Sequence, residues 1–359
     1  MCCPNASGRR PAPQPSSRGG FAEAGRRDLQ QRIVAIAQEA SFPFVGPNCL
    51  GIYVPSHVDT FFLPGERMVK PTVGNVSFVS QSGGILVDHL IKFAGEGVGL
   101  AKAISIGNKA LLGELDLLDY LAQDQATRVI AFYIEGFGPN EGRAFVLNAG
   151  KCGKPVIVLK SGKSAGGSRA VSSHTASLAG DYASFSAALS QYGIVEAANE
   201  LEMISFCESL SVYAKPIQGR VGIVTVSGGH GAMAVDACTA HGIAVPALPE
   251  DVREALRKDL SPSVREIASL VNPIDLTGSG IDDDFVATAE TLFAMEQIDC
   301  VLALLLPYVP GITADLGAKL SSVATRCGKP LIAYVPHVEK YAMLIEGFEL
   351  NGAPVSPSI

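Results

Sequence analysis

The sequence lacks any apolar stretch long enough to cross a lipid bilayer. Its longest apolar runs, such as residues 300–306, have about seven residues, whereas a transmembrane helix needs roughly twenty. The chain also lacks long runs of one charge, since 35 acidic and 28 basic residues give a net charge of −7 without clustering. The basic footprint of a nucleic-acid-binding protein is therefore missing. We expect neither a membrane nor a nucleic acid among its partners.

The cysteines lack the spacing of a disulfide framework or a zinc site. Five of the eight lie singly in apolar segments, and Cys2 and Cys3 are adjacent without a second pair. We therefore expect no metal site and a reduced, cytoplasmic compartment. Residues 1–20 contain no acidic residue and no apolar core of a secretory signal, but several prolines. We interpret residues 1–20 as a disordered leader.

The remaining sequence alternates short β-branched runs with longer amphipathic segments, which is typical of βαβ units on a parallel sheet. Phe285, Ala289 and Leu292 have the spacing of one helix face, and Asp282 to Asp284 suit the N-terminus of that helix. The pattern predicts the α/β class. We expect strands at residues 75–79, 99–106, 129–134, 155–159, 221–226, 300–306 and 330–335.

A weak internal repeat relates the segment from Gly74 to the segment from Gly222. Each reads as a strand, a Ser-Gly-Gly turn and a helix, and the second follows the first by about one domain length. Residues 215–219 between them read as a linker. We therefore expect two doubly wound domains, at residues 66–214 and 219–359. Residues 21–65 are too few for a further domain and look like the end of one.

The two glycine turns are candidate anion sites. Ser82-Gly83-Gly84 and Ser227-Gly228-Gly229 stand where a strand gives way to a helix, whose free N–H groups attract negative charge. Ser80, Ser82 and Ser227 could add hydroxyl donors. The alternative is close packing of strand and helix with no ligand. Residues 160–164 resemble a phosphate loop, but Ile157 stands where its first glycine is needed, so we expect no nucleotide site there.

His174 and Glu135 are candidate catalytic residues. His174 lies among small and hydroxyl-bearing residues that leave an imidazole accessible, and a neutral imidazole is a competent nucleophile near neutral pH. Glu135 follows an apolar run and would project from the carboxyl end of a strand, where it could orient a histidine. The alternatives are a structural histidine and a solvated acid. His230, in the second glycine turn, is a weaker candidate.

Eight motifs together resemble one family, the NDP-forming acyl-CoA synthetases, relatives of succinyl-CoA synthetase. They run in the family's order, and the similarity extends from about Phe21 to about Pro354. The motifs are GPNCLG from Gly46, SQSGG from Ser80, SIGNKA from Ser105, YIEGF from Tyr133, VLKSGKS from Val158, SSHTASLAG from Ser172, VSGGHGAMA from Val226 and NPIDLTG from Asn272.

The resemblance implies flavodoxin-like domains and a reversible reaction. An acyl-CoA and phosphate give an acyl phosphate, a histidine takes the phosphoryl group, and ADP then receives it. His174 matches that histidine and Glu135 its orienting glutamate, while the two glycine turns match those that hold the phosphate. The turn of Gly46, Pro47, Asn48 and Cys49 matches one beside the CoA thioester, and Asn108 matches a residue of the same pocket.

The chain departs from the family pattern at both ends. Most of the Rossmann-like CoA-binding domain has no counterpart, so residues 21–65 are expected to be its C-terminal remnant. No ATP-grasp part follows Ile359, so ATP or ADP and magnesium are expected on a partner subunit or a fused segment, within an oligomer that takes coenzyme A and a small carboxylate as substrates. The alternatives are a CoA-sensing regulatory module and an inactive truncated member.

Overall fold

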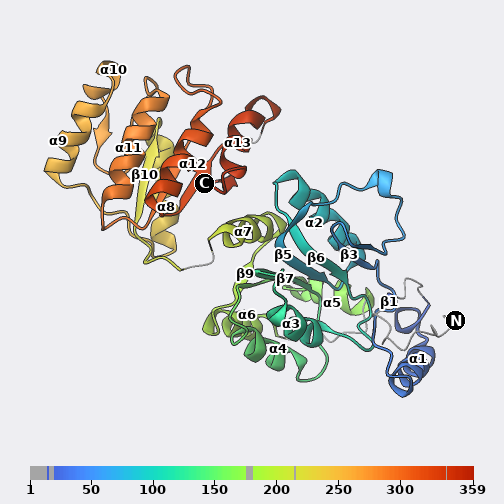
Figure 1. Cartoon of the computed structure of the whole chain (residues 1–359). Helices are drawn as coiled ribbons and strands as arrows, with labels where there is room; N and C mark the ends of the chain where they lie inside the picture. The colour runs from blue at the N-terminus through green and yellow to red at the C-terminus, as the bar shows by residue number, and fades with distance from the viewer. Residues whose placement is uncertain (1–13, 16–19, 175–180, 214–215, 337) are drawn as a thin grey trace. The chain divides into compact units, whose positions relative to one another are not determined.

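The computed structural model describes residues 14–15, 20–174, 181–213, 216–336 and 338–359, with the side chains of residues 14–15 and 172–174 left out. The chain forms two compact units, Met1–Ala214 and Lys215–Ile359, and each is described by itself (Figure 1). Most of the expected leader lies outside the described residues. Gln14–Pro15 within it form a short strand, β1, that pairs in parallel with β2 (Phe44–Val45). Disorder of the leader stays a prediction.

The first unit contains a seven-stranded sheet in the order β4-β3-β6-β5-β7-β8-β9. From β6 to β9 the strands are parallel, in the order that defines the flavodoxin-like doubly wound fold. The strands are β3 (Ile52–Val54), β4 (Val58–Asp59), β5 (Val73–Ser80), β6 (Leu100–Ser105), β7 (Val129–Ile134), β8 (Val156–Lys160) and β9 (Val195–Ala197). The sequence-based strands in this unit are confirmed to within a few residues.

Helices cover both faces of this sheet (Figure 1). Leu86 and Phe93 of α2 (Gly83–Gly95) and Met203 of α7 (Glu200–Val212) pack on one face. The other face is covered by α3 (Glu114–Gln123), α4 (Glu141–Ala149) and α6 (Tyr182–Gln191). The remaining elements are the 3-10 turns η1 (Ala22–Ala24) and η2 (Gly65–Arg67) and the helices α1 (Arg27–Glu39) and α5 (Ala165–His174).

The hairpin of β3 and β4 extends the first sheet upstream of the boundary expected at residue 66. Strand β3 runs antiparallel to β6, with Ile52 opposite Ile104 and Tyr53 opposite Ala103. This hairpin pairs by backbone hydrogen bonds to an edge that the parallel strands leave open. Residues 52–59 therefore pair with the sheet of the first domain. The relation of residues 21–65 to a CoA-binding domain stays a prediction.

The second unit repeats the same strand order, β12-β10-β13-β14-β15, with the short antiparallel strand β11 at the edge. Helix α8 lies on one face and α9, α11, α12 and α13 on the other. The strands are β10 (Val221–Thr225), β11 (Ser269–Leu270), β12 (Ile274–Asp275), β13 (Cys300–Leu304), β14 (Leu331–Tyr334) and β15 (Val355–Ser356). The helices are α8 (Gly228–Ala240), α9 (Glu250–Asp259), α10 (Pro262–Arg265), α11 (Asp282–Ala294), α12 (Leu316–Cys327), η3 (Glu339–Tyr341) and α13 (Ala342–Glu349).

Two sequence motifs of the second unit have a structural explanation. Phe285, Ala289 and Leu292 are buried along α11, as their spacing predicts. Asn272 of the NPIDLTG motif accepts a hydrogen bond from the Ile223 N–H (2.9 Å) and donates to the carbonyls of Val221 (3.0 Å) and Pro246 (2.8 Å). Its buried amide thereby satisfies backbone groups of β10 and of Pro246, which explains the presence of Asn272 without a ligand.

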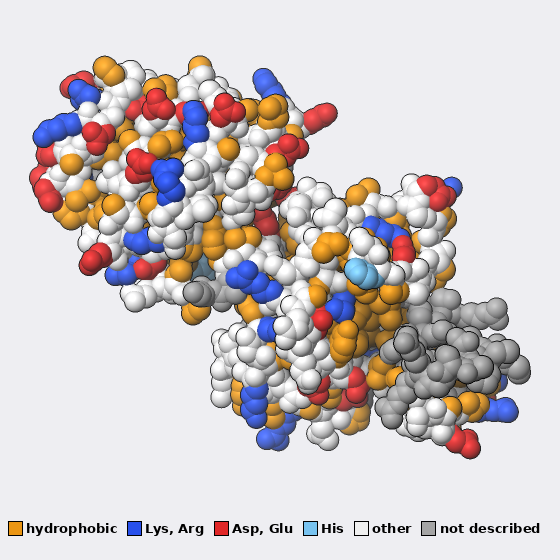
Figure 2. All heavy atoms as spheres, viewed as in Figure 1, with side chains coloured by type: hydrophobic (Ala, Val, Ile, Leu, Met, Phe, Trp, Pro, Cys, Tyr) orange, Lys and Arg blue, Asp and Glu red, His pale blue; other side chains and the backbone are white. Residues whose placement is uncertain are grey.

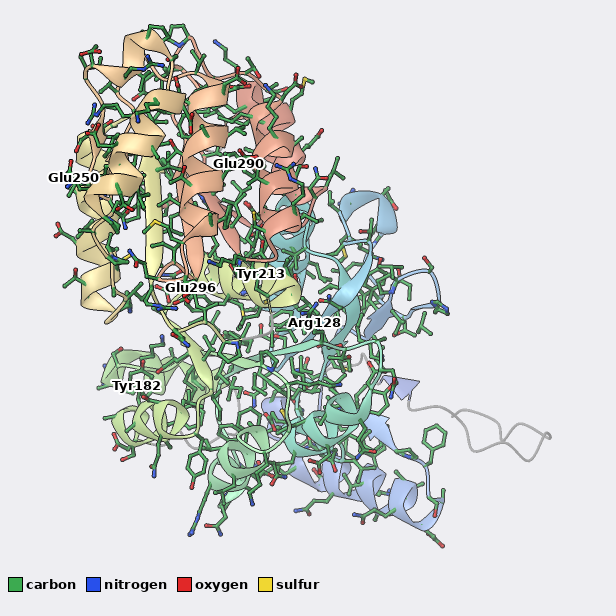
Figure 3. The ribbon with its side chains drawn as sticks, turned by 60° about the vertical axis from the view of Figure 1, so that its left-hand side comes forward. Arg128, Tyr182, Tyr213, Glu250, Glu290 and Glu296 are labelled. Atoms are coloured by element: carbon green, nitrogen blue, oxygen red, sulfur yellow. The ribbon has the colours of Figure 1, made fainter. Side chains whose placement is uncertain are left out.

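The surface carries both signs of charge. Basic and acidic side chains are interspersed over the second unit on the face drawn in Figure 2. Glu250 on α9 and Glu290 on α11 are examples (Figure 3), and Glu290 pairs with Arg326 at 2.8 Å. Within the described residues, no helix is both long and apolar enough to span a membrane.

Candidate active site

The candidate site lies at the carboxyl ends of β5 and β7 in the first domain. Strand β5 leads into α2 on one face of the sheet, whereas β7 leads into α4 on the other face. The two connections therefore diverge and leave a crevice between them. In open α/β sheets this point is the usual place of a ligand.

The first glycine turn presents the N-terminus of α2 to this crevice. Ser82 is the N-cap, and its hydroxyl accepts from the Ile85 N–H at 3.4 Å. The Ser80 hydroxyl is fully buried, donates to the Ser82 carbonyl (2.7 Å) and accepts from the Ser82 N–H (3.1 Å). The Ser80 hydroxyl therefore stabilises the turn through the Ser82 backbone, while Ser82, Gly83 and Gly84 line the crevice.

A cavity of about 510 Å³ opens at this turn. It brings together half of the site residues that the sequence singles out, although they come from separate segments: Asn48, Cys49, Ser82, Gly83, Gly84, Asn108 and Glu135. Leu50, Phe62, Leu63 and Val87 supply an apolar part of its wall. A polar anion-binding turn beside an apolar wall suits a ligand with one charged and one apolar part.

The turn of Gly46 to Cys49 is held against the chain at Asn108. The backbone N–H of Asn108 donates to the Pro47 carbonyl, and the N–H of Ala110 donates to the Gly46 carbonyl, both at 2.9 Å. The side chain of Asn48 donates to that of Asn108 at 3.3 Å. Gly46 and Pro47 thus anchor the turn through their carbonyls, while Asn48 and Cys49 line the cavity.

Asn108 also contacts the segment before and within α1. Its side-chain amide donates to Gln30 at 3.0 Å and to the Glu23 carboxylate. Burial raises the pKa of Glu23, but the hydrogen bonds from Asn108 and from backbone N–H groups outweigh it, so this pKa lies below its usual value. A negative charge is thereby kept close to Asn108.

Glu135 lines the same cavity as the glycine turn and is half-buried. Its backbone carbonyl accepts from the buried ammonium of Lys160 at 2.6 Å. Burial lowers the pKa of Lys160, and the Glu135 charge partly offsets this effect. His174 ends α5, which follows β8, but its side chain and residues 175–180 lie outside the described part of the chain. Pairing of Glu135 with His174 stays a prediction.

Three polar residues at or near the cavity, Gln81, Lys109 and Glu114, are not among the residues that the sequence singles out. Gln81 nevertheless lies in the SQSGG motif and Lys109 in SIGNKA. Gln81 is buried and contacts Glu135, Gly136 and Glu114. The ammonium of Lys109 donates to both carboxylate oxygens of the buried Glu114 (2.9 and 3.0 Å) and to the Gly136 carbonyl (2.9 Å). Together they form a hydrogen-bonded network under the Glu135 segment.

The second domain repeats the glycine turn. Ser227 is the N-cap of α8, and its N–H donates to the Thr225 hydroxyl at 3.1 Å, as Ser82 does to Ser80. The Ser227 hydroxyl lies 2.9 Å from Nδ1 of His230, whose ring packs near Tyr334. Gly228 stands so close to Asp275 that a Cβ there would lie 3.1 Å from its carboxylate. The predicted turn at Ser227, Gly228 and Gly229 is therefore present.

One cluster has the composition of a metal site. Asp88, His89 and Glu200 offer ligand atoms within 4.8 Å of one another. The ammonium of Lys92, however, lies 2.6 Å from both carboxylates. Lys92 thus already supplies the positive charge at this junction of α2 and α7.

Comparisons with known proteins agree with this architecture. A family model described as a succinyl-CoA ligase like flavodoxin domain matches residues 73–210, and a Ligase-CoA domain matches residues 221–325. Acetate–CoA ligase [ADP-forming] I of Archaeoglobus fulgidus is 37% identical over 292 residues, which are 80% of this chain and 41% of that protein. The alpha subunit of acetate–CoA ligase [ADP-forming] II of Pyrococcus furiosus is 35% identical over 94% of this chain and 72% of its own length.

A solved structure of similar fold is the dinucleotide-forming acetyl-coenzyme A synthetase 1 of Ca. Korarchaeum cryptofilum, in complex with phosphate and ADP. It has a TM-score of 0.84 and 29% identity, covering 96% of this chain and 74% of that one. This chain spans well under half the length of some relatives, such as that of A. fulgidus, and nearly three quarters of the P. furiosus alpha subunit. With both domains matched, the chain belongs to the ADP-forming acyl-CoA synthetase family.

Proposed function

We propose that this chain is the alpha-type part of an ADP-forming acyl-CoA synthetase that forms an acyl phosphate and carries its phosphoryl group on His174. The observation that supports this most is the 510 Å³ cavity, in which the Asn48–Cys49 turn, the N-terminus of α2 and Glu135 meet. An anion-binding turn, a carboxylate and an apolar wall are the groups that the reaction needs around an acyl group and a phosphate.

In the first step, a phosphate oxygen attacks the thioester carbonyl carbon of acyl-CoA. The carbon–sulfur bond breaks, and coenzyme A leaves as the thiol once its sulfur takes up a proton. The N–H groups of Gly83 and Gly84 lie in the first turn of α2, where they have no partner within the helix, and would hold the phosphate. Asn48 and Cys49 would flank the pantetheine end of coenzyme A.

In the second step, a ring nitrogen of His174 attacks the phosphorus of the acyl phosphate. The bond between phosphorus and the acyl oxygen breaks, and the carboxylate leaves. Glu135 would accept a hydrogen bond from the other ring nitrogen, which fixes the tautomer and stabilises the positive charge on the ring. The phosphohistidine then gives its phosphoryl group to ADP.

The nucleotide would bind on an ATP-grasp part, either a partner subunit or a fused segment. The name of the P. furiosus relative, a subunit alpha, supports a separate partner. Magnesium bound with the nucleotide there would neutralise charge on the phosphates during transfer. The second glycine turn, at Ser227 to Gly229, is proposed to hold phosphate during the same cycle.

Labelling with acyl phosphate tests the proposal without the nucleotide part. The chain is incubated with acetyl [³²P]phosphate, and acid-labile label is mapped by peptide analysis. We expect label on His174 in the wild type and none in His174→Ala, whereas His241→Ala, which changes an exposed histidine at the end of α8, keeps it. Absence of label in the wild type would favour a regulatory module that binds CoA without catalysis.

A further inference from the structure

The buried side chain of Gln81 uses its full hydrogen-bonding capacity at the candidate site. Its Oε1 accepts from the backbone N–H groups of Glu135 (2.6 Å) and Gly136 (3.0 Å). Its Nε2 donates to the Gly136 carbonyl (2.8 Å) and to a carboxylate oxygen of Glu114. A primary amide has two acceptor and two donor positions, so all four are occupied.

The surrounding charges fix which way this amide points. Glu114 is almost completely buried and paired with Lys109, so its carboxylate can only accept hydrogen bonds. The NH₂ group of Gln81 must therefore face Glu114, which turns its oxygen toward the N–H groups of Glu135 and Gly136. Glu114 and Lys109 thus determine the orientation of Gln81, whose amide oxygen accepts from the backbone N–H groups of Glu135 and Gly136.

The second domain shows that the glycine turn itself does not require this amide. In both domains a hydroxyl two residues before the N-cap serine binds that serine's backbone, Ser80 in one and Thr225 in the other. The residue between them is Gln81 in the first domain and Val226 in the second. The polar side chain is therefore specific to the domain that carries Glu135.

We propose that Gln81 is a positioning residue for Glu135, and through it for phosphoryl transfer to His174. This inference rests on the proposed function. Gln81 belongs to the turn that precedes α2, and its side-chain amide is hydrogen-bonded to the backbone of Glu135 and Gly136. The phosphate-binding turn and the orienting carboxylate are thereby held at one separation, and a displacement of about 1 Å between reacting groups can cost roughly 10²-fold in rate.

The test compares two substitutions of similar size, Gln81→Glu and Gln81→Leu, by the rate of His174 labelling from acetyl [³²P]phosphate. In Gln81→Leu the bonds to the Glu135 segment are lost, so we expect the maximal rate to fall by about 10²-fold, with a smaller change in the acyl phosphate concentration for half-maximal rate. The α2 N–H groups that bind phosphate are unchanged in this variant.

Gln81→Glu adds a pH signature that a merely structural role would not give. The new carboxylate would face Glu114, with Lys109, Glu135, Glu141 and Lys160 as the other charged groups around it. At high pH two carboxylates oppose each other. At lower pH a shared proton lets the residue donate to Glu114 again while its other oxygen accepts from the Glu135 N–H.

We therefore expect the rate of Gln81→Glu, relative to wild type, to recover as pH falls from 8 toward 6, and that of Gln81→Leu to stay low. Ser77→Ala is the matched control, because Ser77 lies in β5, the strand before Gln81, but does not line the cavity. The substitution removes a buried 2.8 Å hydrogen bond to Thr127. It should lower the melting temperature and leave the labelling rate unchanged.

The outcomes separate the two claims. If wild-type protein takes no label on His174, the proposed function fails, and the inference with it. If wild type is labelled and both Gln81 variants, shown folded by circular dichroism, match it in rate and pH profile, the function stands and the positioning role of Gln81 is overturned.

Discussion

The backbone of Gly107 lies directly against the carbonyl oxygen of Asn48. Gly107 has φ +51°, and a Cβ at this position would overlap the carbonyl oxygens of both Asn48 and Pro47. This contact holds the Asn48–Cys49 turn beside Asn108 at the mouth of the cavity. No residue other than glycine fits here without moving one of the two segments.

Gly107→Ala should therefore destabilise the protein and open the cavity. A side chain at positive φ costs about 1 kcal/mol or more, and overpacking adds about 1–3 kcal/mol, so we expect a loss of roughly 2–4 kcal/mol. Urea unfolding of the variant and of wild type measures this loss in the free energy of unfolding. Gly95→Ala in α2 is the control, because nothing lies near its Cβ and the change should stay within about 1 kcal/mol. Equal losses in the two variants would show that the Gly107–Asn48 contact is not tight.

Glu135→Gln should keep the fold and slow the labelling of His174. The amide keeps the shape of the side chain but removes the negative charge that would stabilise a histidine cation, so we expect a decrease of roughly 10²- to 10⁴-fold. Glu290→Gln, on the surface of α11 in the second domain (Figure 3), is the control for a lost carboxylate. A labelling rate for Glu135→Gln equal to that of wild type would make Glu135 a bystander.

Much of the architecture is predictable from the sequence, for a physical reason. The central parallel strands are buried on both faces, so β7 and β10 appear as continuous apolar runs at the positions expected. The glycine turns are visible because local sequence alone determines a strand, a Ser-Gly-Gly turn and a helix. The hairpin of β3 and β4 is less visible, because its short strands are stabilised by pairing with β6, far along the chain.

The residues of the candidate site also fall into those that the sequence indicates and those that it does not. Glu135 and the first glycine turn follow from their places at strand ends, and the resemblance added Asn48 and Asn108. Gln81, Lys109 and Glu114 could not be singled out, because each is an ordinary polar residue whose importance depends on three segments meeting. Ser80 was expected among the phosphate ligands, but its buried hydroxyl is bound to the Ser82 backbone. A motif indicates candidate residues but not which of their atoms face the cavity.

The cysteines should differ sharply in reactivity. Cys327 is exposed, whereas Cys207 and Cys300 are buried. Burial raises the pKa of both thiols, that of Cys300 to about 12. Because the thiolate is the reactive form, iodoacetamide at pH 8 should modify Cys327 and leave these two intact until the protein unfolds. Peptide mass spectrometry, with and without urea, reads out each site. Rapid native labelling of Cys207 or Cys300 would contradict the packing of their cores.

Lys160 should make stability depend on pH in the alkaline range. Its ammonium is buried, and burial lowers its pKa below the unfolded value of 10.5. Between the lowered pKa and 10.5 the unfolded chain holds more protons than the folded chain, so stability rises with pH there. Below the lowered pKa both states carry the charge, and its full burial cost opposes folding. Wild type should therefore gain stability relative to Lys160→Met as pH increases toward 10.5, by at most about 1.4 kcal/mol for each pH unit.

Urea unfolding of both proteins between pH 7 and 10 measures this difference, in which the titration of the other groups cancels. Lys151→Met, at an exposed position, controls for the lost positive charge. If wild type instead loses stability relative to Lys160→Met over this range, the buried ammonium is stabilised by its contacts with the Glu135 and Ser161 carbonyls more than burial penalises it.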